Sequence, residues 1–178
     1  MLLDAGVSVD AVASDVDESA LACEDPVRLA VGLAAQKAEA VAARMPDRWV
    51  LGADQVLADE GGIFGKPASE ADQRARLLSM RGRSHRLITG WALRGPGAPV
   101  DAHAVTTMHM RADVELAEID AYVATREGLY CAGGYAAEGL GGFLFSKVDG
   151  DWYNVIGLPL FDVIGALRER GWRFEGRS

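Results

Sequence analysis

Two runs rich in β-branched and aromatic residues flank a turn signal near the middle of this chain. The runs are SHRLITGWALR (84–94) and AHAVTTMHMR (102–111), and the pentapeptide GPGAP stands between them. Glycine and proline at this density interrupt regular structure, so the pattern predicts a β-hairpin. Two further runs, WVLGADQVLAD (49–59) and FLFSKVDG (143–150), also have strand character.

Four segments with helical periodicity alternate with these strands. The first, at residues 24–47, has Asp25 as a capping residue and Pro26 in its first turn. The second begins at Ser69 with Asp72 three residues later, which is a capping-box pattern. The other two are residues 114–127, with Leu116, Ile119 and Val123 on one face, and residues 158–171.

This alternation predicts an α/β fold with a mixed, twisted sheet flanked by helices. No internal repeat or linker divides the chain, so we expect one domain over residues 1–178. The opening differs from the rest: Met1–Ala5 read as the last turn of a helix that Gly6 ends, and a strand-like alternation follows at residues 7–11. Domains rarely start on the last turn of a helix, so we expect that native residues are missing upstream.

The charge balance restricts the class of partner. The net charge is −8 and the pI is near 4.9, which argues against nucleic acid or a membrane surface, because both are polyanionic. No apolar run reaches the roughly 18 residues that span a bilayer. A few lysines and backbone amides still suffice to bind a small anion. Cys23 and Cys131 are far apart and predict two reduced thiols in a cytoplasmic protein.

Carboxylates occur at two positions where they could bind a metal ion or orient a water molecule. Asp54 directly follows the apolar stretch at residues 50–53. A carboxylate at the end of such a strand is suited to holding a hard cation or orienting a water molecule. The alternative is an aspartate that only caps a turn. The loop SDVDE (14–18) carries several carboxylates of the kind that Mg²⁺ or Mn²⁺ prefers, although acidic loops are more often simply solvated.

Two lysines are candidate phosphate ligands. Lys66 lies in GKP, where glycine allows close approach and proline stiffens the loop. Lys37 lies late in the first helix, where an ordinary exposed lysine is the alternative. The stretch CAGGYAAEGLGG (131–142) contains one acidic residue, Glu138, and either lines a flat ligand or forms a flexible surface loop.

Taken in order, these motifs resemble the Maf family of nucleoside triphosphate pyrophosphatases. The matching pieces are SDVDE, AAQKAEAV, LGADQV, FGKP, RGRSHRLITGWAL, AEIDAYV, CAGGYAAEG and DGDWYNVIGLPL, which together cover most of the chain. The resemblance implies an elongated two-lobed architecture of the Maf/ITPase-like kind, with a central cleft, often dimeric. It implies hydrolysis between the α- and β-phosphates of a nucleoside triphosphate, with a divalent cation, Mg²⁺ or Mn²⁺, as cofactor.

The resemblance also assigns roles to the candidate residues. It implies that Asp54 and Lys66 are catalytic, that Glu18 and Asp54 hold the metal, and that Lys37 binds substrate. Gln55 after GAD and Glu138 in AAEG are similar to the branch that acts on 7-methyl-GTP. A carboxylate accepts hydrogen bonds from the N1–H and amine of a guanine that N7-methylation makes cationic.

Two alternatives stay open. One is a dTTP/UTP pyrophosphatase of the same family, whose members usually have threonine after GAD and glutamine in the glycine-rich stretch. The other is a non-catalytic nucleotide-binding regulator of cell division, because the Ser/Arg phosphate loop with which the family begins is absent here. The expected partner is in each case a small-molecule nucleotide, in a cytoplasmic protein and possible homodimer.

Overall fold

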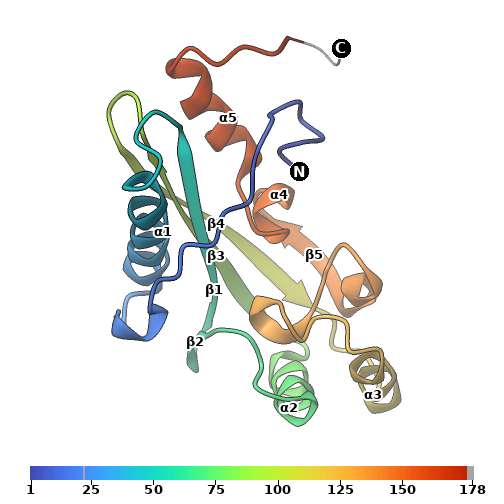
Figure 1. Ribbon diagram of the computed structural model, residues 1–178. Helices are drawn as coiled ribbons and strands as arrows, with labels where there is room; N and C mark the ends of the chain where they lie inside the picture. The colour runs from blue at the N-terminus through green and yellow to red at the C-terminus, as the bar shows by residue number, and fades with distance from the viewer. Residues whose placement is uncertain (22, 176–178) are drawn as a thin grey trace.

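The computed structural model describes residues 1–21 and 23–175 of the chain (Figure 1). A five-stranded sheet with the order β2-β1-β3-β4-β5 forms its framework. The strands are β1 (Val50–Asp59), β2 (Gly62–Phe64), β3 (Ser84–Arg94), β4 (Val100–Met110) and β5 (Phe145–Asp149). The helices are α1 (Pro26–Ala42), α2 (Glu70–Met80), α3 (Leu116–Ala124), α4 (Trp152–Val155) and α5 (Leu160–Glu169), with short 3₁₀ turns η1 (Glu18–Ala20), η2 (Ala132–Gly134) and η3 (Leu140–Leu144).

The α/β class and the central hairpin are confirmed, with β3 and β4 paired from Ser84↔His109 to Leu93↔Val100. All the pairings among the described strands are antiparallel, so the parallel pair that a mixed sheet would contain is not found there. Each strand runs in the opposite direction to its neighbours in the order β2-β1-β3-β4-β5, including the pairs β1–β3 and β4–β5, whose strands are separated by helices in the sequence. No helix in the described residues is long and apolar enough to cross a membrane.

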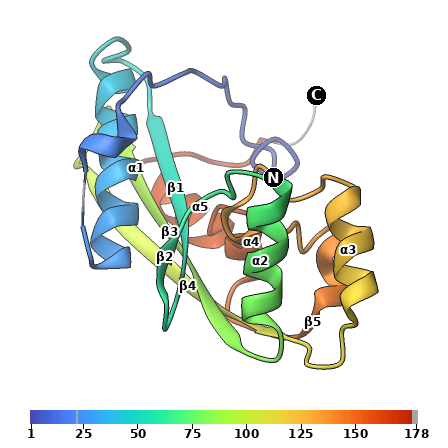
Figure 2. The same ribbon diagram turned by 90° about the horizontal axis from the view of Figure 1, so that it is seen from below.

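Helix α1 alone covers one face of the sheet (Figure 2). Asp25 caps the helix as predicted, because its Oδ1 accepts from the backbone N–H of Val27 at 2.9 Å. The helix backbone lies unusually close to the sheet, since a Cβ at Gly52 would overlap the carbonyl oxygen of Ala34, and one at Gly90 would overlap Ala30. These two glycines therefore set the distance from α1 to strands β1 and β3.

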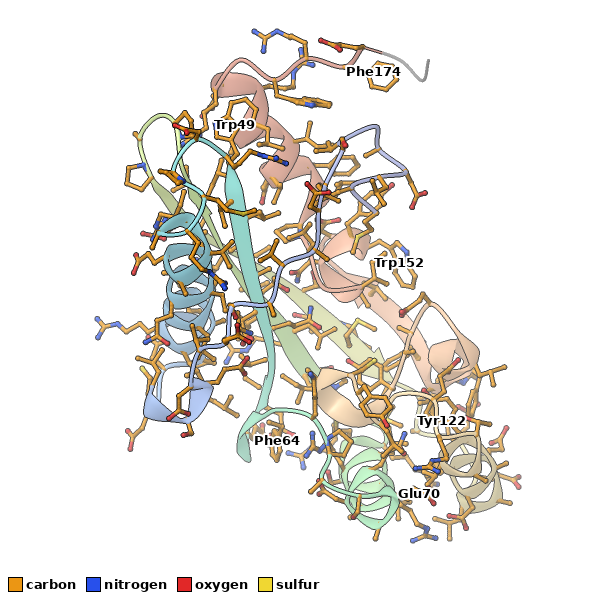
Figure 3. All side chains as sticks on the ribbon, in the orientation of Figure 1. Trp49, Phe64, Glu70, Tyr122, Trp152 and Phe174 are labelled. Carbon is orange, nitrogen blue, oxygen red and sulfur yellow. The ribbon has the colours of Figure 1, made fainter. Side chains whose placement is uncertain are left out.

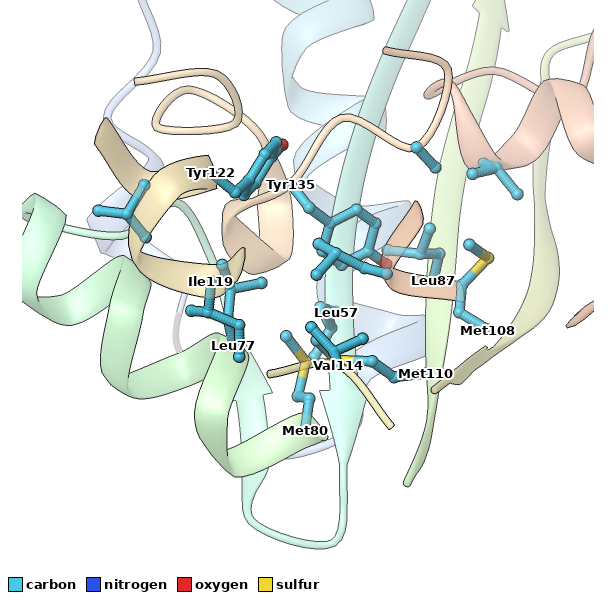
Figure 4. Packing of buried hydrophobic residues seen from close by; sticks show 14 residues of the cluster. Leu57, Leu77, Met80, Leu87, Met108, Met110, Val114, Ile119, Tyr122 and Tyr135 are labelled. Carbon is cyan, nitrogen blue, oxygen red and sulfur yellow. The ribbon is translucent and has the colours of Figure 1, made fainter. Parts of the chain in front are cut away.

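The opposite face carries two separate hydrophobic cores. One joins the ends of β1, β3 and β4 to α2, α3 and the glycine-rich stretch (Figure 4). The other joins the far ends of the same strands to α5 and the N-terminal residues. A row of buried or half-buried polar side chains separates the two cores: Gln55, Thr89, Thr106 and Asn154. Each lobe thus has its own core, in agreement with the two-lobed architecture that the resemblance implied.

Two local predictions are wrong. Leu116, the first residue of α3, is 52% exposed, whereas Ile119 and Val123 are buried. The segment at residues 7–11 forms no strand, since no described strand pairs with it. The residues before it do form a helical turn, with the N–H of Ala5 donating to the carbonyl of Met1 at 2.9 Å.

Candidate active site

Lys37 joins the two carboxylates that were expected to hold a metal. Its Nζ lies 2.6 Å from Asp54 Oδ1 and 2.9 Å from Glu18 Oε1. Asp54 comes from β1, Glu18 from η1, and Lys37 from the fourth turn of α1, so three elements meet at one ammonium group. Only 20% of the Lys37 side chain is exposed, which rules out the ordinary surface lysine that was the alternative.

The neighbourhood of Asp54 is an open edge of the sheet. Strand β2 pairs with β1 only at residues 57–59, so residues 50–56 have β3 on one side and no described strand on the other. Side chains from both faces of β1 reach solvent at such an edge. This explains how Asp54 and Gln55, which point to opposite faces, both border one pocket.

That pocket brings together four of the residues predicted from the sequence. It has a volume of about 270 Å³, and its walls include Asp54, Gln55, Lys66 and Glu138. Lys37 borders a neighbouring cavity of about 430 Å³ between α1 and residues 8–14. Glu18 reaches the site only through its contact with Lys37. The six residues therefore form one continuous group along the open edge of β1.

Gln55 is held by the polar row between the two cores. Its Nε2 donates to Thr89 Oγ1 at 2.9 Å and to the backbone carbonyl of Asn154 in α4 at 2.6 Å. Both amide hydrogens are used by these bonds. The side-chain oxygen of Gln55 has no partner among the described residues. Gln55 therefore presents a hydrogen-bond acceptor to the pocket.

The loop that carries Lys66 is fixed at the preceding residue. The carbonyl of Gly65 accepts from the guanidinium of Arg76 and from the N–H of Gly133, the latter at 3.4 Å. Pro67 is buried behind the loop. Lys66 itself is exposed and makes no ion pair with any described residue, which leaves its ammonium group available to an anion.

The glycine-rich stretch is an ordered wall rather than a flexible surface loop. Gly133 and Gly134 are buried with φ of +85° and +81°, a conformation that L side chains rarely adopt. Gln73 of α2, itself fully buried, donates from Nε2 to the carbonyls of Glu127 at 2.7 Å and Gly134 at 2.8 Å. Gln73 was not predicted from the sequence, where its only signal is a polar side chain on the inner face of a helix.

The aromatic residue nearest the pocket mouth was also missed. Tyr130 is 81% exposed and borders the pocket next to Cys131. Figure 3 shows the side chains of the lobe that contains α2 and α3, with Tyr122 of α3 labelled. A large exposed ring beside a polar pocket is suited to stacking on a flat ligand. Its position depends on the fold of the glycine-rich stretch, so the residue type alone gave no indication of it.

Burial and charge shift the pKa values of the central pair. Burial raises the pKa of the Asp54 carboxyl above its usual value, although the hydrogen bond and charge of Lys37 act in the opposite direction. Burial also disfavours the charge of Lys37, but its hydrogen bonds to Asp54 and Glu18 outweigh that effect and raise its pKa. The ammonium group therefore stays protonated at neutral pH and offsets part of the negative charge of both carboxylates.

The donor set fits a divalent cation that a substrate helps to hold. Glu18 and Asp54 both approach Lys37 Nζ, so a cation in its place would meet two carboxylates. Within residues 1–21 and 23–175, no group of three or more His, Cys, Asp or Glu side chains is placed to hold a metal ion. Magnesium sites in phosphate-processing proteins commonly use one or two carboxylates and complete their coordination with phosphate oxygens and water.

The histidines lie outside the pocket, as expected for structural or exposed residues. His85 is buried, with Nε2 2.5 Å from the hydroxyl of Tyr135. His109 lies between Ser84 and Asp149, with 2.8 Å to each, on the surface of the sheet. Although these three residues are of the types found in a hydrolytic triad, no described pocket includes both Ser84 and His109. We regard them as a cross-strand hydrogen-bonded row.

Comparison with known proteins shows the family to which the chain belongs. The family model described as Maf-like protein matches residues 1–170, so the chain belongs to the Maf family. The dTTP/UTP pyrophosphatase of Geobacter sulfurreducens is 40% identical over 172 residues, which cover 96% of this chain and 90% of that protein. The 7-methyl-GTP pyrophosphatase of Xanthomonas oryzae pv. oryzae is 41% identical over 159 residues, which cover 89% of this chain and 83% of that protein.

Proposed function

We propose that this chain hydrolyses 7-methyl-GTP between its α- and β-phosphates and releases 7-methyl-GMP and pyrophosphate. As a member of the Maf family with relatives named pyrophosphatases, the chain is a hydrolase of nucleotide acid anhydrides. Relatives with two different substrate names match it about equally well. The choice of base therefore has to be argued from the pocket.

The observation that carries the choice is the excess of hydrogen-bond acceptors on the pocket wall. Glu138 contributes a carboxylate, and Gln55 contributes its side-chain oxygen because its amide hydrogens are already used. Guanine presents two adjacent donors, N1–H and the exocyclic amine, which match a carboxylate. Thymine and uracil present one N–H between two carbonyls, and those carbonyls would face the carboxylate unfavourably.

The positive charge of a 7-methylated guanine adds a second reason. A carboxylate at Glu138 attracts a cationic base, whereas it gains nothing comparable from neutral guanine. The exposed ring of Tyr130 is available to stack on the same base, and aromatic rings attract cationic partners. Both effects favour the methylated base over unmodified GTP.

The remaining residues suit the phosphate end of such a substrate. Phosphoryl transfer depends on positioning and on neutralising charge. Lys66 lies on a fixed loop and has no ion pair with any described residue, so it would hold the phosphates. Lys37 would contribute a second positive charge. Mg²⁺ or Mn²⁺ would be held by Glu18 and Asp54 and would supply further charge neutralisation. Asp54 would orient or deprotonate the attacking water.

The test is pyrophosphate release from 7-methyl-GTP, GTP, dTTP and UTP, with Mg²⁺ or Mn²⁺, by the wild-type protein and Asp54→Asn. Asp47→Asn is the matched control, because it removes the same charge at an exposed loop position. We expect 7-methyl-GTP to be the preferred substrate and Asp54→Asn to lose turnover of it. Preference for dTTP or UTP would refute the assignment of the base and support the alternative.

Nucleotide binding without turnover by the wild-type protein would instead favour the regulatory alternative. Cytoplasmic location and a homodimer stay predictions. Gel filtration combined with light scattering would decide the oligomeric state.

A further inference from the structure

We infer that Glu127 is a positioning residue for base selection, acting through the backbone of the glycine-rich stretch that carries Glu138. The inference rests on the proposed function, because it concerns how the same pocket distinguishes bases. Glu127 follows α3 by three residues and does not border the pocket. Its carboxylate nevertheless contacts the chain directly beyond Glu138.

Both carboxylate oxygens of Glu127 accept hydrogen bonds from backbone amides. Oε1 accepts from the N–H of Leu140 at 3.1 Å, and Oε2 accepts from the N–H of Gly141 at 3.0 Å. These amides open the 3₁₀ turn η3, where backbone N–H groups lack partners within the turn. Hydrogen bonds from amides to an ionised carboxylate are stronger than those to a neutral acceptor.

The glycine between Glu138 and these amides makes the contact possible. A Cβ at Gly139 would overlap Oε1 of Glu127, so the backbone lies directly on the carboxylate. A side chain at position 139 would therefore displace the Glu127 carboxylate from its place against residues 139–141. The fit between Glu127 and Gly139 therefore brings the carboxylate within reach of both amides.

The chain is also held on the other side of Glu138. The N–H of Ala136 donates to the hydroxyl of Tyr122 at 3.0 Å, and the carbonyl of Gly134 accepts from Gln73 at 2.8 Å. Glu138 thus lies between two backbone attachments, at Ala136 and at residues 140–141. Gln73 of α2 also donates to the carbonyl of Glu127 at 2.7 Å, so one side chain holds the backbone at both Gly134 and Glu127.

Glu138 has no hydrogen bond or ion pair with any described residue and is exposed. No hydrogen bond or ion pair within the described chain therefore fixes the direction of its carboxylate. That direction follows from the backbone at positions 137–139, which Tyr122 and Glu127 hold from either side. Loosening one attachment would let Glu138 turn away from the base without removing it.

The first experiment measures base selection in Glu127→Gln, which keeps the size of the side chain and one oxygen acceptor. The measured quantity is the ratio of kcat/KM for 7-methyl-GTP to that for dTTP. We expect the ratio to fall by about tenfold, the effect of roughly one net hydrogen bond to a charged group. Glu118→Gln is the matched control, because Glu118 also accepts a backbone N–H, that of Glu115 at 2.7 Å, but lies outside the pocket. In this control the ratio should not change.

The second experiment asks whether Glu127 acts through Glu138. If it does, Glu127→Gln should change the ratio in the wild-type background and leave it unchanged in a Glu138→Gln background. An equal loss for both substrates, or additive effects in the double variant, would overturn the inference and leave Glu127 as a stabilising residue only. A wild-type protein that distinguishes neither nucleotide, in turnover or in binding measured by calorimetry, would instead overturn the proposed function.

Discussion

Asp54 and Gln55 are neighbours in β1, yet their side chains lie on opposite faces of the sheet. Asp54 contacts Lys37 of α1 at 2.6 Å, whereas Gln55 donates to the carbonyl of Asn154 in α4 at 2.6 Å. Successive residues of a strand alternate between faces, so this separation is a consequence of the backbone. The open edge of β1 lets both residues border one pocket. In the proposed function, Asp54 serves the phosphate chemistry and Gln55 serves base selection.

We therefore expect substitutions at the two positions to have different effects. Asp54→Asn should reduce kcat for every nucleotide tested by at least about a hundredfold, the range typical for a lost acid–base group. Gln55→Thr should mainly lower the ratio of kcat/KM for 7-methyl-GTP to that for dTTP, because it replaces the amide oxygen on the wall by a hydroxyl on a shorter side chain, which can donate as well as accept. Steady-state kinetics on both substrates would check this. A Gln55→Thr protein that loses turnover of both equally would contradict the separation.

Lys37→Met should make the protein depend on a divalent cation for stability. It removes the ammonium group that contacts both Glu18 and Asp54, and breaking a largely buried ion pair is destabilising, here by about 2 kcal/mol after allowance for partial exposure. Mg²⁺ could then replace the missing charge, so the Tm of the variant should rise more with added Mg²⁺ than that of the wild type. Thermal melts with Mg²⁺ and with EDTA would measure the difference.

The pH dependence of Lys37→Met gives a second check. Burial already raises the pKa of Asp54, and the variant loses the Lys37 charge that opposes this effect. A carboxyl whose folded pKa lies above its unfolded value destabilises the protein when ionised, so stability should recover as the pH falls through the raised pKa. If the variant and the wild type were equally stable from pH 7 to pH 5, the charge of Lys37 would not affect the ionisation of the Asp54 carboxyl.

Much of the fold was predictable because its determinants are local. The turn signal GPGAP and the capping residues Asp25 and Ser69 all act within a few positions, and the structure has the hairpin and both helix starts where they were expected. The all-antiparallel sheet was not predictable in this way. It depends on the pairing of β1 with β3 and of β4 with β5, and these strands are far apart in the sequence, so their direction is set by tertiary packing.

The residues of the candidate site also fall into two groups, those with a local signal in the sequence and those placed by tertiary packing. Lys66 stood out because glycine and proline enclose it, and Asp54 because it follows an apolar run. Gln73, Arg76 and Glu127 carry no such signal, since each acts by bonding to a backbone carbonyl or amide far along the chain, such as that of Gly134 or Gly65. Their roles follow from packing between α2, α3 and the glycine-rich stretch, which periodicity does not reveal.

Gly52→Val should damage stability and activity together. The new side chain would collide with the carbonyl of Ala34 and push α1 away from β1, which costs about 1–3 kcal/mol or more for an overpacked site. Moving α1 also separates Lys37 from Asp54, so kcat should fall even in protein that remains folded. Gly165→Ala in α5 is the control, because no atom lies near the added Cβ, and it should stabilise the helix slightly. Urea unfolding and kinetics would check both.

His85 should make the protein acid-sensitive. Burial lowers its pKa to about 4, with a smaller opposing effect from the charge of Asp59. The folded pKa is below the unfolded value of 6.5, so the stability due to neutral His85 is present above pH 6.5 and is lost as the pH falls toward 4. A shift of this size corresponds to roughly 3 kcal/mol at most.

Replacing His85 by glutamine should remove this part of the pH dependence while retaining a polar group near the hydroxyl of Tyr135. Urea unfolding at pH 7 and at pH 5 would show it, because the wild type should lose more stability between these values than His85→Gln does. His103→Gln, at an exposed position of β4, is the matched control and should follow the wild type. If His85→Gln lost as much stability as the wild type on acidification, other groups would be responsible, and the buried imidazole would have to be protonated in the folded state without penalty.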